Sequence, residues 1–140
     1  MNSTDFPAIF AEGWAHPKPD PFLEFFRPLI HRAATFTQPM FADAHGRDEV
    51  ERMFRRLFVL FPDLSAEPIR SAVVDDVVFI ESTCTATLGR KPFRFSVCDR
   101  FVIEDGQILE RRSFSDPTSA VFAVLRRPTS WPRVIRSRLA

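Results

Sequence analysis

The sequence predicts an α+β domain, in which about three N-terminal helices pack on one face of a sheet and a short helical tail follows. Helical patterns fill the chain up to about residue 61, and segments with period-two alternation then follow one another without intervening helices. This order favours a meander of antiparallel strands over the alternating strands and helices of an α/β fold. A chain of 140 residues is most simply one domain and can bury a real core.

The N-terminal helices are predicted from their start and stop signals. Residues 5–14 begin with Asp5 as a cap, and a second short helix begins at Asp20 and must kink or end at Pro28. The clearest helix covers residues 47–61, where apolar side chains at helical spacing form one stripe and acids occupy the first turn.

Five segments are predicted to be strands. The first, residues 34–41, contains Pro39, which makes it an edge strand or one that breaks at its end. The remaining four alternate clearly, and Asp105-Gly106 between the last two is a strong hairpin signal. These four cover residues 65–74, 77–88, 93–103 and 107–115.

The C-terminal segment 119–140 is predicted to form one or two short helices that pack on the same domain as residues 1–118. It holds five arginines and no acid, so the remaining 14 basic and 18 acidic side chains leave the rest of the chain at −4. We expect a solvated basic surface, with closure of a cavity or contact with anionic lipid as alternatives. The apolar side chains expected to pack inward are Val121, Phe122, Leu125, Trp131 and Ile135.

Composition argues against several classes of protein. The net charge of +1 gives no indication of a nucleic-acid partner. No apolar run is long enough to span a bilayer and the N-terminus lacks the basic start of a secretion signal, so a cytoplasmic protein is expected. Scattered histidines and two cysteines provide no metal-ligand spacing, and four glycines form no phosphate-cradling loop. We therefore expect no metal and no organic cofactor.

One of the predicted strands directs an acid at the core. Apolar side chains alternate through residues 93–103, and Asp99 has the parity of the apolar face. If Leu88 pairs with Phe93 across the preceding turn, Ser82 lies opposite Asp99 in the interior.

The same register has consequences on both faces of the sheet. It pairs Cys84 with Val97 in the interior and Glu81 with Arg100 on the outer face, an opposite-charge pair that supports a sheet. Cys84 and Cys98 then point to opposite faces and cannot form a disulfide.

The neighbour of Asp99 on the following strand decides its chemistry, and two registers are open. A two-residue loop puts Arg112 opposite Asp99, whereas a bulge brings in Arg111 or Ser113. An adjacent arginine makes the acid a base or a structural ion pair. Apolar surroundings with a hydroxyl keep it protonated, as a hydrogen-bond donor.

Three local phrases fall in a characteristic order: "HRAATFTQP", "AHGRDEVERMFRRLFVLFPDL" and "CDRFVIEDGQILERRSFSDP", together covering about residues 30–117. With the order of elements, they resemble the nuclear transport factor 2-like superfamily and, within it, the SnoaL-like polyketide cyclase group. The resemblance implies a cone-shaped, curved, mixed sheet and a ligand cavity between sheet and helices. It also implies a homodimer formed through the sheet and a small apolar, oxygenated ligand, such as a polyketide- or steroid-like ring.

The ketosteroid isomerases of this superfamily provide one set of roles to test. Their oxyanion-binding acid falls on Asp99. Their general base falls on Gln38, which cannot take a proton, and their tyrosine falls on Trp14, which can donate only through its indole. Isomerisation by that mechanism is therefore not expected.

The limonene epoxide hydrolases provide a second set. Their Arg-x-Asp pair falls on Ser82 and Cys84, and their other aspartate falls near Ser113. All three functional groups are missing, so that mechanism is not expected either.

We therefore expect Asp99 to act as a catalytic acid or base in isomerase- or cyclase-like chemistry. The alternative is a non-catalytic ligand-binding or dimerisation module of the same fold, and a cavity filled by phenylalanines 36, 58, 79 and 95 would leave only a scaffold. The side chains expected to contact the ligand are Trp14, Gln38, Ser82, Cys84, Phe101 and Ser113.

Overall fold

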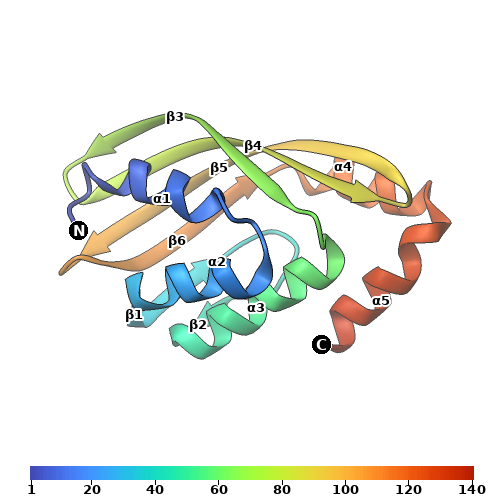
Figure 1. Cartoon of the computed structure of the whole chain (residues 1–140), viewed down its shortest axis with the longest axis horizontal. Coiled ribbons are helices and arrows are strands. Elements are labelled where there is room, and N and C mark those ends of the chain that lie inside the picture. Colours follow the sequence, from blue (N-terminus) through green and yellow to red (C-terminus); the bar gives the residue numbers. More distant parts are fainter.

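A curved six-stranded sheet, covered on one face by helices, forms the body of the protein (Figure 1). The computed structural model describes residues 1–140. The strands are β1 (Ile30–Thr37), β2 (Ala44–His45), β3 (Ser65–Val74), β4 (Val77–Leu88), β5 (Lys91–Glu104) and β6 (Gln107–Ser115). They are ordered β2-β1-β6-β5-β4-β3, and only the β1–β6 pair is parallel. The mixed sheet and the α+β class are as the sequence predicts.

Five helices accompany the sheet. They are α1 (Phe6–Trp14), α2 (Pro19–Phe26), α3 (Gly46–Leu60), α4 (Pro117–Leu125) and α5 (Trp131–Leu139), with short 3₁₀ turns at Arg27–Leu29 and Pro128–Ser130. The first three helices cover the inner face of the sheet, and α4 and α5 lie at one end of the molecule (Figure 1). No helix is both long enough and apolar enough to cross a membrane.

The longest helix, α3, begins with acids that match its dipole and buries one apolar stripe. Glu49 accepts a hydrogen bond from the backbone nitrogen of His45 at 2.9 Å, which satisfies a donor at the helix start. Val50, Phe54 and Phe58 lie on the buried face. The predicted helix over residues 47–61 is therefore confirmed to within a residue at each end.

The two short helices start differently from the prediction. Asp5 stands at the start of α1, but its side chain accepts no capping hydrogen bond. The second helix begins at Pro19, one residue before the predicted cap, because a proline in the first turn has no N–H to satisfy. Asp20 lies within that first turn, and Pro28 lies in the 3₁₀ turn that ends the helical segment.

The first strand begins four residues earlier and is more central than predicted. It begins at Ile30 and pairs with both β2 and β6, so it is not an edge strand. It ends at Thr37, because Pro39 has no N–H with which to continue the ladder.

The β4–β5 hairpin differs from the predicted register by two residues. Gly89 and Arg90 both have positive φ (58° and 64°) and form a two-residue turn that pairs Leu88 with Lys91 rather than with Phe93. Because the difference is an even number, every side chain keeps its predicted face. Asp99, now opposite Ile80, therefore still points inward and is 4% exposed.

The cross-strand partners change with the register. Ser82 pairs with Val97 and Cys84 with Phe95. On the outer face, Glu81 forms an ion pair with Arg70 at 2.8 Å instead of meeting Arg100. Both cysteines are free thiols.

A β-bulge in β6 settles which side chain lies beside Asp99. The Asp105-Gly106 turn pairs Ile103 with Ile108, but Val102 pairs with Glu110, so Leu109 is an extra residue. The extra residue reverses the parity of the rest of β6. Arg111 and Ser113 then face inward, and Ser113 lies opposite Asp99. Of the two registers considered for β5 and β6, the protein therefore adopts the one with a bulge.

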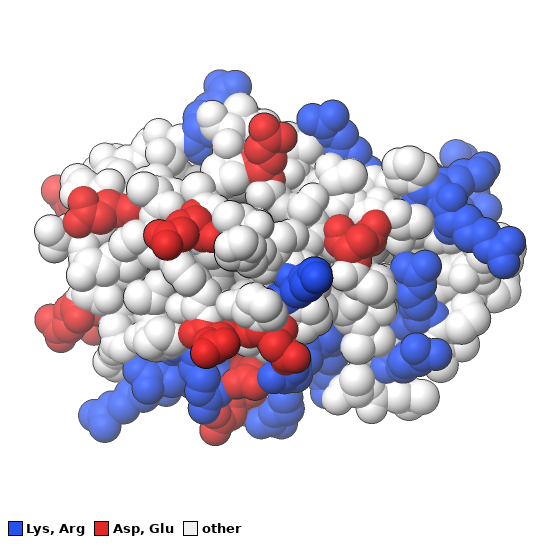
Figure 2. Space-filling view, in the orientation of Figure 1, with Lys and Arg blue, Asp and Glu red and all other residues white.

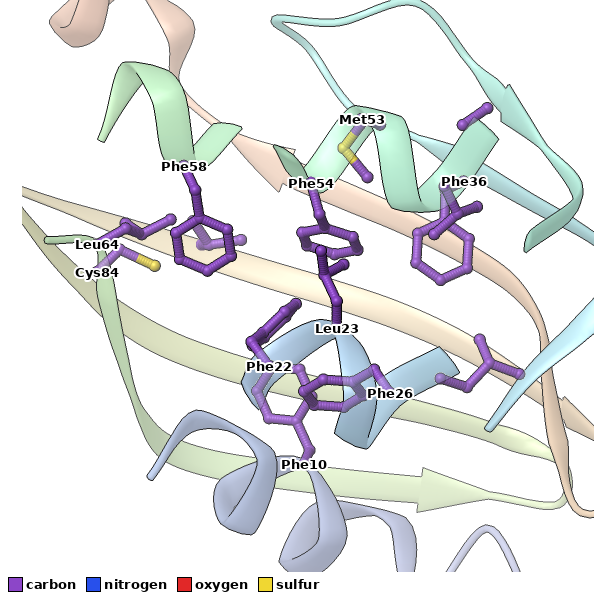
Figure 3. Packing of buried hydrophobic residues seen from close by; sticks show 14 of the residues in the cluster. Phe10, Phe22, Leu23, Phe26, Phe36, Met53, Phe54, Phe58, Leu64 and Cys84 are labelled. Carbon is purple, nitrogen blue, oxygen red and sulfur yellow. The ribbon is translucent and has the colours of Figure 1, made fainter. Parts of the chain in front are cut away.

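Aromatic rings fill most of the space between sheet and helices (Figure 3). The ring of Phe22 is at the centre, with ring centroids at 4.6 Å from Phe26, 4.7 Å from Trp14, 5.0 Å from Phe54 and 5.3 Å from Phe58. Each fully buried ring contributes on the order of 1.5–3 kcal/mol through the hydrophobic effect. This cluster holds α1, α2 and α3 in place over the sheet.

The C-terminal tail, residues 117–140, is anchored by polar contacts and by other apolar side chains than those predicted to pack inward, namely Ala120, Ala123, Val124 and Val134. Arg127 and Arg133 donate to the carbonyls of Leu88 (3.0 Å) and Thr87 (3.1 Å) at the end of the β4–β5 hairpin. Ser137 donates to the carbonyl of Arg56 on α3 at 3.1 Å. The side chains predicted to be buried are instead 48–60% exposed: Val121, Phe122, Leu125, Trp131 and Ile135.

Candidate functional site

A pocket opens between the inner face of the sheet, α1, α3 and the segment that follows β1. Its empty volume, including the open mouth, is about 700 Å³. Most of the wall is apolar: Phe10, Trp14, Pro39, Met40, Phe41, Met53, Phe54, Leu57, Phe61, Leu64, Ala66, Phe95 and Val97. The polar lining is Gln38, Ser82, Cys84, Asp99, Arg111, Ser113 and Ser115.

A buried ion pair lies on the sheet side of this pocket. Arg111 Nη2 is 2.9 Å from Asp99 Oδ1, and the two side chains are 13% and 6% exposed. The contact is charge pairing rather than an aligned hydrogen bond, because Oδ1 has no donor in hydrogen-bonding geometry. Of the two environments considered for Asp99, the protein adopts the one with an interior arginine.

Two aromatic rings hold the guanidinium of Arg111. Its Cζ atom lies 5.8 Å from the centroid of Phe36 and 5.7 Å from the centroid of Phe54, both within the range of cation–π attraction. The arginine is thus held by β1 and α3 as well as by its own strand. Its position is determined before any ligand enters.

Four buried polar atoms on the pocket wall have no hydrogen-bond partner in the protein. They belong to side chains from α1, β4, β5 and the segment after β1, and the large majority of buried polar atoms in proteins do find partners. The indole nitrogen of Trp14, the amide oxygen of Gln38, the hydroxyl of Ser82 and Oδ1 of Asp99 form this set. The amide nitrogen of Gln38 is satisfied, since it donates to the carbonyl of Ala42 at 2.9 Å.

Charge is disfavoured on the thiol side of the pocket. Burial, and then the negative charge of Asp99, raise the pKa of the Cys84 thiol to about 12. Burial also raises the pKa of Cys98, on the outer face. Neither cysteine has the lowered pKa of a nucleophilic thiolate, so covalent thiol catalysis does not fit this pocket.

A deeper hollow lies behind the ion pair. Its empty volume is about 350 Å³, and it shares Trp14, Asp99 and Arg111 with the main pocket. Phe101, predicted to contact a ligand in the main pocket, lines this deeper hollow instead, with its ring 4.7 Å from that of Phe6. The ion pair therefore borders both spaces.

The structure brings most of the predicted site residues together. All except Phe101 line the main pocket, namely Trp14, Gln38, Ser82, Cys84, Asp99 and Ser113. Arg111 completes the site, and it could be assigned only once the bulge in β6 was known. The apolar segment Met40-Phe41 was also missed, because it follows a strand-breaking proline and has no periodicity.

Three of the four phenylalanines that could have filled the cavity lie elsewhere. Phe79 is on the outer face of the sheet and 36% exposed, and only Phe95 of the four lines the main pocket. Asp116, near the end of the third phrase, caps α4 by accepting from the backbone nitrogen of Thr118 at 2.9 Å. No three His, Cys, Asp or Glu side chains lie close enough together to hold a metal ion.

Comparisons with known proteins agree with this architecture. The family model of the SnoaL-like domain matches residues 8–111. No curated protein matches the chain in sequence.

Solved structures resemble the chain over most of its length. A protein from Jannaschia sp. CCS1, assigned as a SnoaL-like polyketide cyclase, is 19% identical, with a TM-score of 0.74 over 86% of this chain and 89% of its own. TerC, crystallised with polyporic acid, is 14% identical, with a TM-score of 0.74 over 86% and 97%. A limonene epoxide hydrolase-like enzyme of M. tuberculosis is 19% identical, with a TM-score of 0.65 over 89% and 93%.

These identities are low, so the solved structures establish the shared fold, while the family model covers well over half of the chain. The fold is that of the nuclear transport factor 2-like proteins. This chain belongs to the SnoaL-like domain family.

Proposed function

We propose that the main pocket binds a small, apolar, oxygenated molecule such as a polyketide- or steroid-like ring. The observation that carries the proposal is the set of four polar atoms that have no hydrogen-bond partner on a largely apolar wall. A ligand that offers both donors and acceptors would satisfy them, and its apolar body would replace water against the rings. TerC, a structural relative, was crystallised with polyporic acid, which is consistent with a ligand of this kind.

We further propose that Asp99 carries a proton during isomerisation or cyclisation of the ligand. Its carboxylate takes a proton from a carbon next to a ligand carbonyl, and Arg111 provides positive charge for the resulting enolate oxygen. Return of the proton from the carboxylic acid to another carbon gives isomerisation. Attack of the enolate carbon on a second carbonyl, followed by protonation of the new alkoxide, gives cyclisation.

A non-catalytic binding module is the second candidate. Asp99 is the only acid that lines the main pocket, and the position of the isomerase base holds Gln38, whose amide is tied to the carbonyl of Ala42. A single carboxylate that is already paired with an arginine could serve only to orient a ligand.

The two candidates are separated by one substitution in the pocket. Polyketide- and steroid-like ketones are screened for those that raise the melting temperature, and turnover of each hit is then measured for the wild type and Asp99→Asn. An enzyme is expected to bind hits in both forms and to lose turnover by about 100-fold or more in the variant. Equal binding without turnover in either form supports the binding module. If no hit binds, both candidates are wrong.

The ion pair itself can be tested by removing its positive partner. Arg111→Met leaves Asp99 buried without a counter-ion and is expected to lower the free energy of unfolding by about 3 kcal/mol. Arg112→Met, one residue along the same strand but on the exposed face, is expected to change it by less than about 0.5 kcal/mol. Urea denaturation measures both, and equal losses would contradict the inward assignment of Arg111.

We also propose the homodimer through the sheet that the family resemblance implies. The outer face of the sheet exposes Phe79 (36%) and Phe114 (47%), which a second sheet would cover. Sedimentation equilibrium of the wild type and of Phe79→Ser/Phe114→Ser tests this, since a dimer through the sheet would dissociate in the variant. A cytoplasmic location stays a prediction, which cell fractionation would test.

A further inference from the structure

We propose that the outer face of the C-terminal tail binds the surface of an anionic lipid bilayer. This tail face consists of the exposed apolar side chains of α4 and α5 and the exposed arginines beside them. Its apolar members are Val121, Phe122, Leu125, Trp131, Ile135 and Leu139. The proposal does not depend on what the pocket binds.

On α5 the apolar side chains form a single stripe. Trp131, Ile135 and Leu139 are spaced four residues apart and are 48%, 60% and 83% exposed, so they lie on one outward side of the helix. Arg136 and Arg138 are exposed at the two edges of this stripe. The opposite side of the helix, which includes the buried Ser137, packs on the domain.

The apolar surface of α4 adjoins this stripe. Val121, Phe122 and Leu125 are 52%, 52% and 60% exposed. The indole nitrogen of Trp131 donates to the carbonyl of Val124 at 2.9 Å, which ties the start of α5 to the end of α4. The two helices therefore present neighbouring apolar surfaces rather than separate ones.

The five arginines of the tail divide into two groups. Arg127 and Arg133 are occupied, because they donate to backbone carbonyls of the β4–β5 hairpin. The other three, Arg126, Arg136 and Arg138, are exposed and form no ion pair, and the segment 119–140 holds no acid. Figure 2 shows basic side chains gathered at the end of the molecule that carries the tail.

The combination of groups identifies the partner as a bilayer. An apolar stripe flanked by arginines lets apolar side chains enter the acyl boundary while the guanidinium groups reach lipid phosphates. Tryptophan is enriched at this boundary. A nucleic acid offers no apolar layer for six exposed side chains, and a symmetric pair of tails brings arginines of like charge together.

The proposal is tested with the full chain and vesicles of phosphatidylcholine, with or without phosphatidylserine. Cosedimentation is expected with the anionic vesicles only, and to weaken as salt is raised. Arg136→Gln/Arg138→Gln is expected to weaken binding by about tenfold or more, since each basic group near an anionic surface contributes attraction. Ile135→Ser/Leu139→Ser is expected to weaken it as strongly.

Matched variants on the sheet control for net charge and apolarity. Arg94→Gln/Arg112→Gln removes the same charge from exposed positions on β5 and β6, and Ile69→Ser/Val74→Ser removes two exposed apolar side chains of β3. Both are expected to bind anionic vesicles like the wild type. In addition, binding is expected to shift the fluorescence of Trp131 to the blue, and Trp131→Phe should keep binding while losing that shift.

Three outcomes would overturn the proposal. The first is no binding to phosphatidylserine vesicles at low salt. The second is an equal loss in the tail variants and in their sheet controls. The third is a dimer that Ile135→Ser/Leu139→Ser dissociates and Phe79→Ser/Phe114→Ser does not, because a second copy would then occupy the tail face.

Discussion

The pocket and the tail face leave opposite kinds of group without a partner. In the pocket, polar atoms such as Ser82 Oγ lie unbonded among apolar side chains, whereas in the tail, apolar side chains such as Leu139 lie in water. Both departures oppose the usual distribution of residues between core and surface. In each region an arginine lies over a phenylalanine ring, Arg111 over Phe54 and Arg126 over Phe122. The comparison shows that an arginine–phenylalanine pair is part of the packed structure in the pocket, whereas in the tail the same pair is exposed and free to contact another surface.

The two arginine–phenylalanine pairs provide the largest expected contrast. Phe54→Ala removes a ring that is 6% exposed and is expected to lower the free energy of unfolding by about 4 kcal/mol, through lost burial and the cavity left behind. Phe122→Ala removes a ring that is 52% exposed and should change it by less than about 0.5 kcal/mol. Urea denaturation of both variants measures the contrast. A large loss in Phe122→Ala would show that the tail face is already covered in solution.

The pocket disfavours ionisation of the Cys84 thiol, and the pH dependence of the free energy of unfolding reveals this. The pKa of Cys84 is raised to about 12 in the folded protein, above the ordinary value of 9.0, so the unfolded chain loses this proton first. The contribution of the protonated thiol to stability is therefore complete below pH 9 and falls as pH rises toward 12, by about 3 kcal/mol at pH 11.

Denaturation between pH 8 and pH 11 in roughly one-unit steps measures this slope. Cys84→Ala should flatten most of it, whereas Cys98→Ala, on the outer face, should retain most of it. The chain has no tyrosine to titrate in this range. An unchanged slope in Cys84→Ala would mean that the thiol is not held in its protonated form.

Two buried serines, one in the pocket and one in the tail, provide the smallest expected difference in stability. The expected changes have opposite signs. The hydroxyl of Ser82 in the pocket has no partner, so Ser82→Ala is expected to raise the free energy of unfolding by about 1 kcal/mol. The hydroxyl of Ser130 in the tail donates to the carbonyl of Arg127 at 2.7 Å, so Ser130→Ala is expected to lower it by about 1 kcal/mol. Chemical denaturation gives the two signs. The idea that Ser82 is reserved for a ligand fails if Ser82→Ala destabilises like Ser130→Ala.

The parts of the fold that follow from local periodicity could be predicted from the sequence. Helix α3 and strands β4 and β5 are long and regular, and their patterns need no knowledge of distant contacts. The inward direction of Asp99 was predictable for the same reason. It depends only on parity within β5 and therefore tolerated the two-residue difference in the hairpin register.

The parts that depend on contacts between elements were not predictable. The turn at Gly89 and Arg90 requires positive φ at an arginine, and the sequence gives no sign that this residue adopts it. The tail was assigned the wrong inner face, because its amphipathic pattern shows which side chains share a face but not which face is covered. Its anchors, Arg127 and Arg133, bind backbone carbonyls that have no sequence signature.

Because of the extra residue Leu109, β6 can lose one residue and still pair with β5 along its whole length. Deleting Leu109 removes the bulge, restores a regular ladder and leaves Arg111 beside Asp99. Deleting Arg112 instead gives a chain of the same length with Ser113 still opposite Asp99, but it brings Glu110 inward in place of the arginine. Comparing ligand binding by the two deletion variants would reveal the difference. The position of a single-residue deletion in β6 therefore determines whether a positive or a negative side chain faces the pocket. Substitutions alone would not reveal this dependence.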